Sequence, residues 1–167
     1  MTVSPAITVA ILTCSDRCSA GTAQDISGPL LARLVAEKLG ATVIALACVA
    51  DGAERIQQQL RAWAMQAAPP DLILTTGGTG LSPRDVTPEA TAAVLERFHP
   101  GLLELARMRC IEHTPLTYLS RGMAGTLARS LVINLPGSPK GAGEMFHALV
   151  DILPHAIRML RGDSDHR

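Results

Sequence analysis

Short aliphatic, β-branched runs alternate along this chain with amphipathic stretches of helical period, and this alternation strongly constrains the fold. We predict strands at 7–14, 42–49, 71–76 and 130–135, and helices at 29–39, 53–67, from 87, at 102–111 and from 139. Such alternation implies right-handed crossovers and a sheet covered on both faces. The expected fold class is therefore α/β, a three-layer α/β/α sandwich with a mostly parallel central sheet.

Helix boundaries carry their own signals. Thr87-Pro88 and Ser138-Pro139 each place a side-chain oxygen before a proline, which predicts an N-cap followed by proline in the first helical turn. Pro154 is expected to kink or split the last helix. We find no linker or repeat, so residues 1–167 are interpreted as one domain, with a disordered tail from about residue 162.

Composition excludes several classes of protein. Hydrophobic residues make up 47% and charged residues 18%, which argues against disorder, and the 2% aromatic content requires an aliphatic core. The 15 basic and 15 acidic residues balance, and no basic run is interleaved with aromatics, so nucleic-acid binding is not expected. No apolar stretch approaches the ~18–20 residues of a membrane span, and the first residues do not resemble a secretion signal. We therefore expect a cytoplasmic protein.

Cysteine and histidine do not form a recognisable metal site. None of the cysteines is in a CxxC pair, and the five histidines are scattered. We interpret the cysteines as reduced thiols without an assigned role: Cys14, Cys18, Cys48 and Cys110.

Polar clusters follow the predicted strands directly, where ligands bind in open α/β sheets. The segment TTGGTG at 75–80 is rich in glycine, which lets backbone amides approach an anion closely. It matches neither the Walker loop nor GxGxxG. Taken alone, a glycine-rich segment of this kind is more often a plain turn than an anion site.

Two acids are more informative as a pair than singly. Asp51 follows the second strand and Asp85 follows the third. If those strands were neighbours, both carboxylates would converge on one crevice, where two hard oxygen ligands and a phosphate can hold Mg²⁺. Each acid has an alternative: Asp51 with Glu54 has capping-box spacing, and Asp85 could be a solvated loop acid near a helix start.

Three further clusters are candidate binding loops. A hydroxyl, an acid and a guanidinium follow the first strand in Ser15-Asp16-Arg17, and a hydroxyl and a guanidinium occur together at Ser120-Arg121. The segment 134–139, NLPGSP, places a helix start after a strand, and free amides there attract anions. Surface loops and an ordinary turn are the alternatives.

The string TTGGTGLSPRDVTPEAT closely resembles the signature of the molybdenum-cofactor biosynthesis domain, the family of Mog, MoaB and the gephyrin G domain. The resemblance extends in order to ILTCSDRCSAG, CVADGAERI, PGLLELARMRCIEHTPLTYLSRGMAG and LVINLPGSPK. NLPGSP looks more like the adenylyltransferase branch than the MoaB branch. The resemblance implies a homotrimer that uses ATP and Mg²⁺ to adenylylate the terminal phosphate of molybdopterin, with hand-over of the product to a molybdenum-insertion protein.

The resemblance also implies roles for residues at matching positions. Asp51 and Asp85 would serve metal and nucleotide, and the remaining positions would form the phosphate-binding and pterin-binding loops: Gly77, Gly78, Thr79, Gly80, Ser15, Asp16, Ser120, Arg121, Pro136, Gly137 and Ser138. One departure is Gly52, where the family often has a second acid, so one metal contact is missing.

Two other functions stay open at this point. A non-catalytic, MoaB-like protein could bind molybdopterin or act as a scaffold. A nucleotide pyrophosphatase related to the competence-damage proteins could hydrolyse a nucleotide without any pterin.

Overall fold

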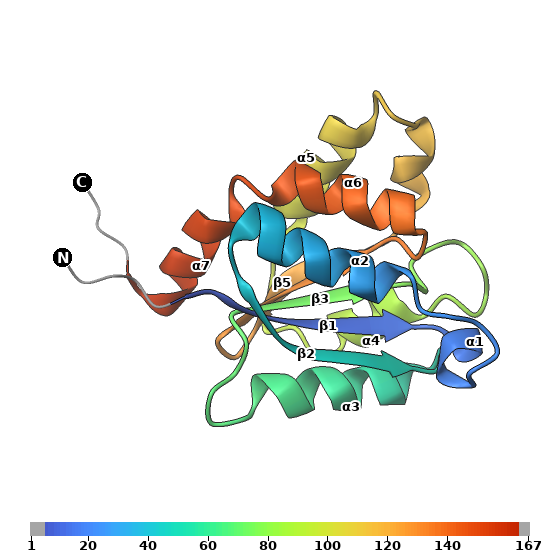
Figure 1. The fold of residues 1–167 in the computed structure, drawn as a ribbon, viewed down its shortest axis with the longest axis horizontal. Helices are drawn as coiled ribbons and strands as arrows, with labels where there is room; N and C mark the ends of the chain where they lie inside the picture. Colours follow the sequence, from blue (N-terminus) through green and yellow to red (C-terminus); the bar gives the residue numbers. More distant parts are fainter. Residues whose placement is uncertain (1–5, 164–167) are drawn as a thin grey trace.

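The computed structural model describes residues 6–163, in which six strands form one sheet in the order β2-β1-β3-β6-β5-β4 (Figure 1). The strands are β1 (Thr8–Cys14), β2 (Thr42–Val49), β3 (Leu72–Thr76), β4 (Arg97–Phe98), β5 (Ala124–Leu127) and β6 (Ser130–Leu135). The first four strands of that order run parallel, whereas β5 is antiparallel to both β6 and β4. The predicted α/β fold with a mostly parallel sheet is confirmed.

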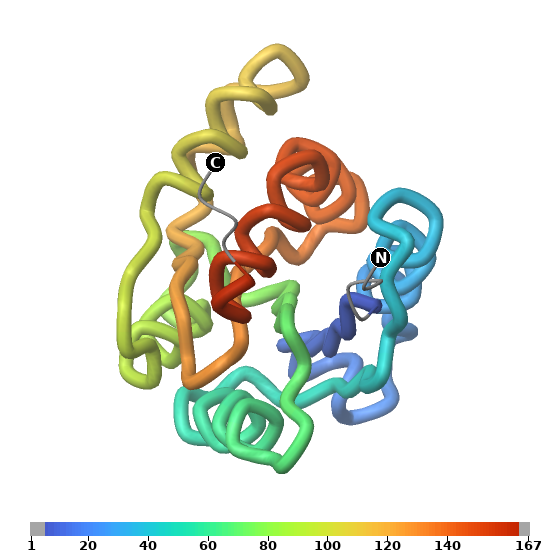
Figure 2. Tube along the Cα trace, turned by 90° about the vertical axis from the view of Figure 1, so that its left-hand side faces the viewer, coloured from blue at the N-terminus to red at the C-terminus, as the bar shows by residue number. Residues whose placement is uncertain are grey.

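Helices cover both faces of the sheet. The longer helices are α2 (Ser27–Leu34), α3 (Ala53–Ala64), α4 (Thr87–Ala92), α5 (Pro100–Cys110), α6 (Pro139–Leu149) and α7 (Leu153–Arg161). Figure 2 shows α3 on the opposite side of the sheet from α2 and α6. Alternate residues of β1 enter two aliphatic cores, Val9 and Ile11 toward α2, α5, α6 and α7, and Ala10 and Leu12 toward α3 and α4. These are the three layers that the sequence predicts.

Local signals explain most of the helix boundaries. The helix predicted at 29–39 is α2 continued by a π-helical turn, η1 (Val35–Leu39), which ends at the left-handed Gly40 (φ 62°). Ser138 caps α6 by accepting a hydrogen bond from the Gly141 amide, as predicted. Pro154 lies in the first turn of α7, so it starts a new helix rather than kinking one. None of the helices between residues 6 and 163 has the length and hydropathy of a membrane span.

Several sequence predictions need correction. β2 is an edge strand, with Ile44 and Leu46 exposed by 45% and 49%, although its apolar sequence predicts burial. Thr87 is the first helical residue of α4 rather than its cap, because Val86 is the capping position and makes no side-chain cap bond. The strands β4 and β5 and the short helices α1 (Asp16–Ser19) and η2 (Pro115–Leu119) were not predicted. Most of the proposed disordered tail, 164–167, lies outside the described residues.

Candidate functional site

The glycine-rich loop after β3 adopts a backbone that only glycine fits well. Gly77 and Gly78 have φ of 100° and 65°. A Cβ on Gly77 would lie 2.2 Å from the Cys14 carbonyl oxygen, and one on Gly78 would lie 2.4 Å from the Thr87 hydroxyl. A Cβ on Gly137 would lie 3.1 Å from the Gly77 Cα. The loops that follow β1, β3 and β6 therefore pack together without intervening side chains.

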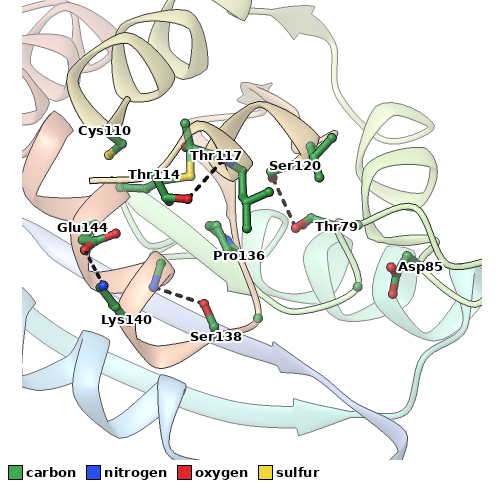
Figure 3. A pocket seen from close by; sticks show the side chains of 17 residues that line it. Thr79, Asp85, Cys110, Thr114, Thr117, Ser120, Pro136, Ser138, Lys140 and Glu144 are labelled. Atoms are coloured by element: carbon green, nitrogen blue, oxygen red, sulfur yellow. Dashed lines mark hydrogen bonds and ion pairs between the residues drawn. The ribbon is translucent and has the colours of Figure 1, made fainter. Parts of the chain in front are cut away.

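Two cavities lie on either side of this loop and share Gly78, Gly137 and Ser138 in their walls. The first, of about 550 Å³, extends toward α5, η2 and α6 (Figure 3). The second, of about 480 Å³, extends toward α1 and the start of α2. Among the predicted residues, the first is also lined by Thr79, Gly80, Asp85, Ser120 and Pro136, and the second by Ser15 and Gly77.

Asp51 is tied to the loop after β1. Its backbone amide donates to Asp16 Oδ1 at 2.9 Å, and the Asp16 amide donates to Asp51 Oδ2 at 3.1 Å. Asp51 does not cap α3, because Gly52 is the capping residue and α3 has no side-chain cap bond. The capping alternative for Asp51 is therefore excluded, and its Oδ1 accepts no hydrogen bond from residues 6–163.

Asp51 and Asp85 both face the glycine loop. Asp51 Oδ1 lies 3.3 Å from the point that a Gly78 Cβ would occupy, and Asp85 Oδ2 lies 2.8 Å from the corresponding point at Gly80. Partial burial raises the pKa of Asp51, and the negative charge of Asp85 raises it further. The expectation that their strands are neighbours is wrong, because β1 lies between β2 and β3. The glycine loop folds back across that gap and brings the acids within electrostatic range.

The loop between Gly80 and α4 is held to both sides of the crevice. Asp85 Oδ2 accepts a hydrogen bond from the Ser82 amide at 3.1 Å. The Arg84 guanidinium forms an ion pair with Asp16. Asp16 therefore joins Arg84 and Asp51, which explains its place after β1.

Arg121 orders this loop from the other side. Its guanidinium donates to the carbonyl oxygens of Gly80 at 2.8 Å and Asp85 at 2.7 Å, and it pairs with Glu89. The neighbouring Ser120 hydroxyl donates to Thr79 Oγ1 at 3.3 Å. Arg121, like Asp16 and Asp51, is absent from the walls of both cavities, and its three contacts fix the position of this loop.

The loop after β6 is fixed by hydroxyl groups. Thr76 donates to the Pro136 carbonyl at 2.7 Å, and Ser27 donates to the Gly137 carbonyl at 2.9 Å. These bonds fix the start of α6 at the wall between the cavities, where the Gly141 amide is already bonded to Ser138 and Pro139 has no N–H to offer. The geometry suits a phosphate placed where the two cavities meet.

Sequence reasoning gave no role of their own to several polar residues near the site, among them Asn134 of the segment 134–139. Asn134 is fully buried and bonds Thr75, Thr91 and the Met123 amide, and an asparagine inside an apolar strand was a usable signal because buried polar groups need partners. Thr117 and Glu144 line the first cavity, although nothing in the sequence places them there, whereas Asn134 lies in the core and lines neither cavity.

The residues present suit a magnesium ion only together with a substrate phosphate. No cluster of three or more His, Cys, Asp or Glu side chains between residues 6 and 163 could hold a metal by itself. Asp51 and Asp85 supply two carboxylates, and Mg²⁺ is often held by one or two carboxylates plus phosphate oxygens and water. The cysteines are free thiols, and burial raises the pKa of Cys14 to about 12.

An open, mostly parallel α/β sheet with glycine-lined anion loops at its carboxyl edge defines a protein that binds phosphorylated ligands. The family model described as "probable molybdopterin binding domain" matches residues 10–155, so the chain belongs to the molybdenum-cofactor biosynthesis domain family.

Known relatives cover nearly the whole chain. It is 37% identical to the molybdopterin adenylyltransferase of Helicobacter pylori strain J99, over 94% of this chain and 89% of the relative. It is 41% identical to the molybdenum cofactor synthesis protein cinnamon of Drosophila melanogaster, over 94% of this chain but only 26% of that longer protein. The crystal structure of the molybdopterin biosynthesis enzyme MoaB from Thermus thermophilus superposes with a TM-score of 0.87 at 46% identity, covering 93% of this chain and 97% of the other.

Proposed function

We propose that this protein is a molybdopterin adenylyltransferase, which transfers AMP from ATP to the terminal phosphate of molybdopterin and releases pyrophosphate. The relatives that carry this name support the assignment. The observation that carries it is the pair of cavities that meet at Gly78, Gly137 and Ser138. Two substrates, one in each cavity, would bring their phosphate groups together at that wall.

The reaction requires positioning and charge neutralisation more than a covalent nucleophile. An oxygen of the molybdopterin phosphate attacks the α-phosphorus of ATP, and the bond from that phosphorus to the oxygen bridging to the β-phosphorus breaks. Backbone amides of the glycine loop would hold the phosphates in line. Asp16, Arg84 and Arg121 would keep the loops that carry these amides in register.

Asp51 and Asp85 would hold Mg²⁺ together with the phosphates. The ion supplies positive charge that offsets the negative charge of the triphosphate. Burial and then the negative charge of Asp85 raise the pKa of Asp51, and a divalent cation between the two carboxylates would offset both effects.

The test is mass-spectrometric detection of adenylylated molybdopterin from purified protein, ATP, Mg²⁺ and molybdopterin. We expect Asp85→Ala to abolish product while leaving the fold intact, because within residues 6–163 the side chain accepts a hydrogen bond only from the Ser82 amide. Asp151→Ala, on the surface beside Arg109, is the matched control and should keep activity. Molybdopterin binding without product from the unmodified protein would instead support a non-catalytic scaffold.

We further propose a cytoplasmic homotrimer that passes its product to a molybdenum-insertion protein. Exposed apolar side chains on β2 and η2 support self-association: Ile44, Leu46, Leu116 and Tyr118. Light scattering coupled to size-exclusion chromatography checks the oligomer, and a monomeric mass at micromolar concentration contradicts it.

A further inference from the structure

The first cavity contains a carboxylate that the fold leaves without a hydrogen-bond donor. Glu144, on α6, lines this cavity, and its side chain is 21% exposed. Its nearest cation is Lys140 Nζ at 3.9 Å, which exceeds hydrogen-bonding distance. Within residues 6–163 no group donates a hydrogen bond to the Glu144 carboxylate, so its oxygens can accept hydrogen bonds from a ligand.

A second unpartnered group lines the same cavity. Thr117, on η2, is only 8% exposed, and its hydroxyl has no hydrogen-bond partner among the described residues. Figure 3 shows Thr117 and Glu144 on elements that border the cavity. Cys110 and Met145 add buried apolar surface to its walls. This cavity therefore combines apolar walls with a carboxylate whose one partner in the described part of the protein is the Lys140 ammonium group, and with a hydroxyl that has none there.

The second cavity differs in this respect. Its only lining carboxylate in the part of the chain that the structure describes, Asp25, already accepts hydrogen bonds from the Thr13 hydroxyl at 2.7 Å and the Gly28 amide at 3.0 Å. Because Asp85 of the first cavity accepts one from the Ser82 amide, Glu144 is the one lining carboxylate of the two cavities that accepts no hydrogen bond from residues 6–163.

A carboxylate accepts two parallel hydrogen bonds, so it matches a ring edge that presents two adjacent N–H groups. The 2-amino-4-oxo-pyrimidine edge of a pterin presents the 2-amino group and N3–H side by side. Adenine presents an amino group beside N1, which is a hydrogen-bond acceptor. The lone pair of N1 and a carboxylate oxygen repel each other, so adenine does not match Glu144 in this way. The apolar walls of the first cavity would cover the faces of a flat ring.

We propose that Glu144 is a specificity-determining residue that binds the aminopyrimidinone edge of the pterin in the first cavity. The proposal rests on the proposed function, because it takes molybdopterin as one of the two substrates. It assigns the second cavity to the adenosine part of ATP. The phosphates of the two substrates then approach the shared wall from opposite sides.

The test uses 6-hydroxymethylpterin and 6-hydroxymethyllumazine as fluorescent probes, and adenosine as a third ligand. Lumazine carries an oxo group in place of the 2-amino group, so it presents an acceptor to Glu144. We expect the unmodified protein to prefer the pterin, and Glu144→Gln to weaken pterin binding about tenfold to a hundredfold. A glutamine amide can donate to the 2-oxo group and accept from N3–H, so the same variant should bind the lumazine more tightly. Adenosine affinity should stay within about twofold.

Glu104→Gln is the matched control, because Glu104 is an exposed glutamate on α5 outside the cavity walls. It should leave all three affinities unchanged. Unchanged pterin binding in Glu144→Gln, or a loss of adenosine binding instead, overturns the proposal. Neither readout depends on AMP transfer, so failure of the proposed activity is detected separately by the absence of adenylylated product.

Discussion

Asp51 and Asp16 exchange two hydrogen bonds, in which the backbone amide of each residue donates to the carboxylate of the other. The exchange joins the loop after β1 to the loop after β2 and uses one oxygen of each acid. Asp51 Oδ1 is left facing Gly78. Asp51 is therefore held in place through Oδ2, while Oδ1 stays available to a ligand.

Replacing Asp51 by asparagine should separate these two roles. The amide oxygen of the introduced side chain can still accept from the Asp16 amide, so Asp51→Asn should fold normally. Loss of the negative charge should lower the rate of AMP transfer by about 100-fold or more and weaken the response to Mg²⁺. Steady-state rates across a magnesium titration check this. Asp151→Asn serves as control, and an unchanged rate in Asp51→Asn contradicts the metal-binding role.

The charge of Asp85 should be measurable at Asp51. Burial and then Asp85 raise the Asp51 pKa, so Asp85→Asn should lower it toward its ordinary value. Because the folded protein holds this proton more tightly than the unfolded chain, ionisation of Asp51 reduces stability as pH rises through the folded pKa. Asp85→Asn should shrink that loss. Carbon-13 NMR titration of the carboxyl group checks the shift, and identical titrations in both proteins contradict it.

The fold was largely predictable because it depends on local period and connection rules. β1, β3 and β6 are short aliphatic runs buried on both faces, and their periodicity identifies them. β2 has the same character but lies at the edge, where Leu46 is exposed, and composition cannot distinguish a core strand from an apolar edge. β4 was missed because two residues carry no period.

The sequence predicts which loops form the site, but it does not predict which side chains contact one another there. The rule that ligands bind beyond the carboxyl ends of parallel strands placed the loops correctly at one edge. The sequence could not show that Arg121 binds Gly80 and Asp85 on the loop and Glu89 on α4, because those contacts span more than thirty residues. The sequence also did not predict Glu144 as a binding residue, because its place in the first cavity depends on how α6 and η2 come together around that cavity.

A substitution at Gly78 tests whether the glycine loop requires glycine because a Cβ has no room there, in addition to the positive φ. Gly78→Ala introduces a Cβ at positive φ, 2.4 Å from the Thr87 hydroxyl and 3.3 Å from Asp51 Oδ1. We expect a loss of about 2–4 kcal/mol in unfolding free energy and loss of AMP transfer. Gly40→Ala has a similar φ of 62° but no atom within 4 Å, so it should lose only about 1–2 kcal/mol and keep activity. Equal losses in the two variants, measured by urea unfolding, would show that space is not limiting.

Asn134 should be the most sensitive polar residue of the core. It is fully buried, and it donates to Thr75 and Thr91 while accepting from the Met123 amide. Asn134→Leu keeps a similar volume but leaves the Met123 amide without its partner, so we expect a loss of about 2–4 kcal/mol. Thr91→Val removes only one of these bonds and should lose about 1 kcal/mol. Urea unfolding with an unchanged m value checks both, and wild-type stability in Asn134→Leu would show that this network contributes little to the fold.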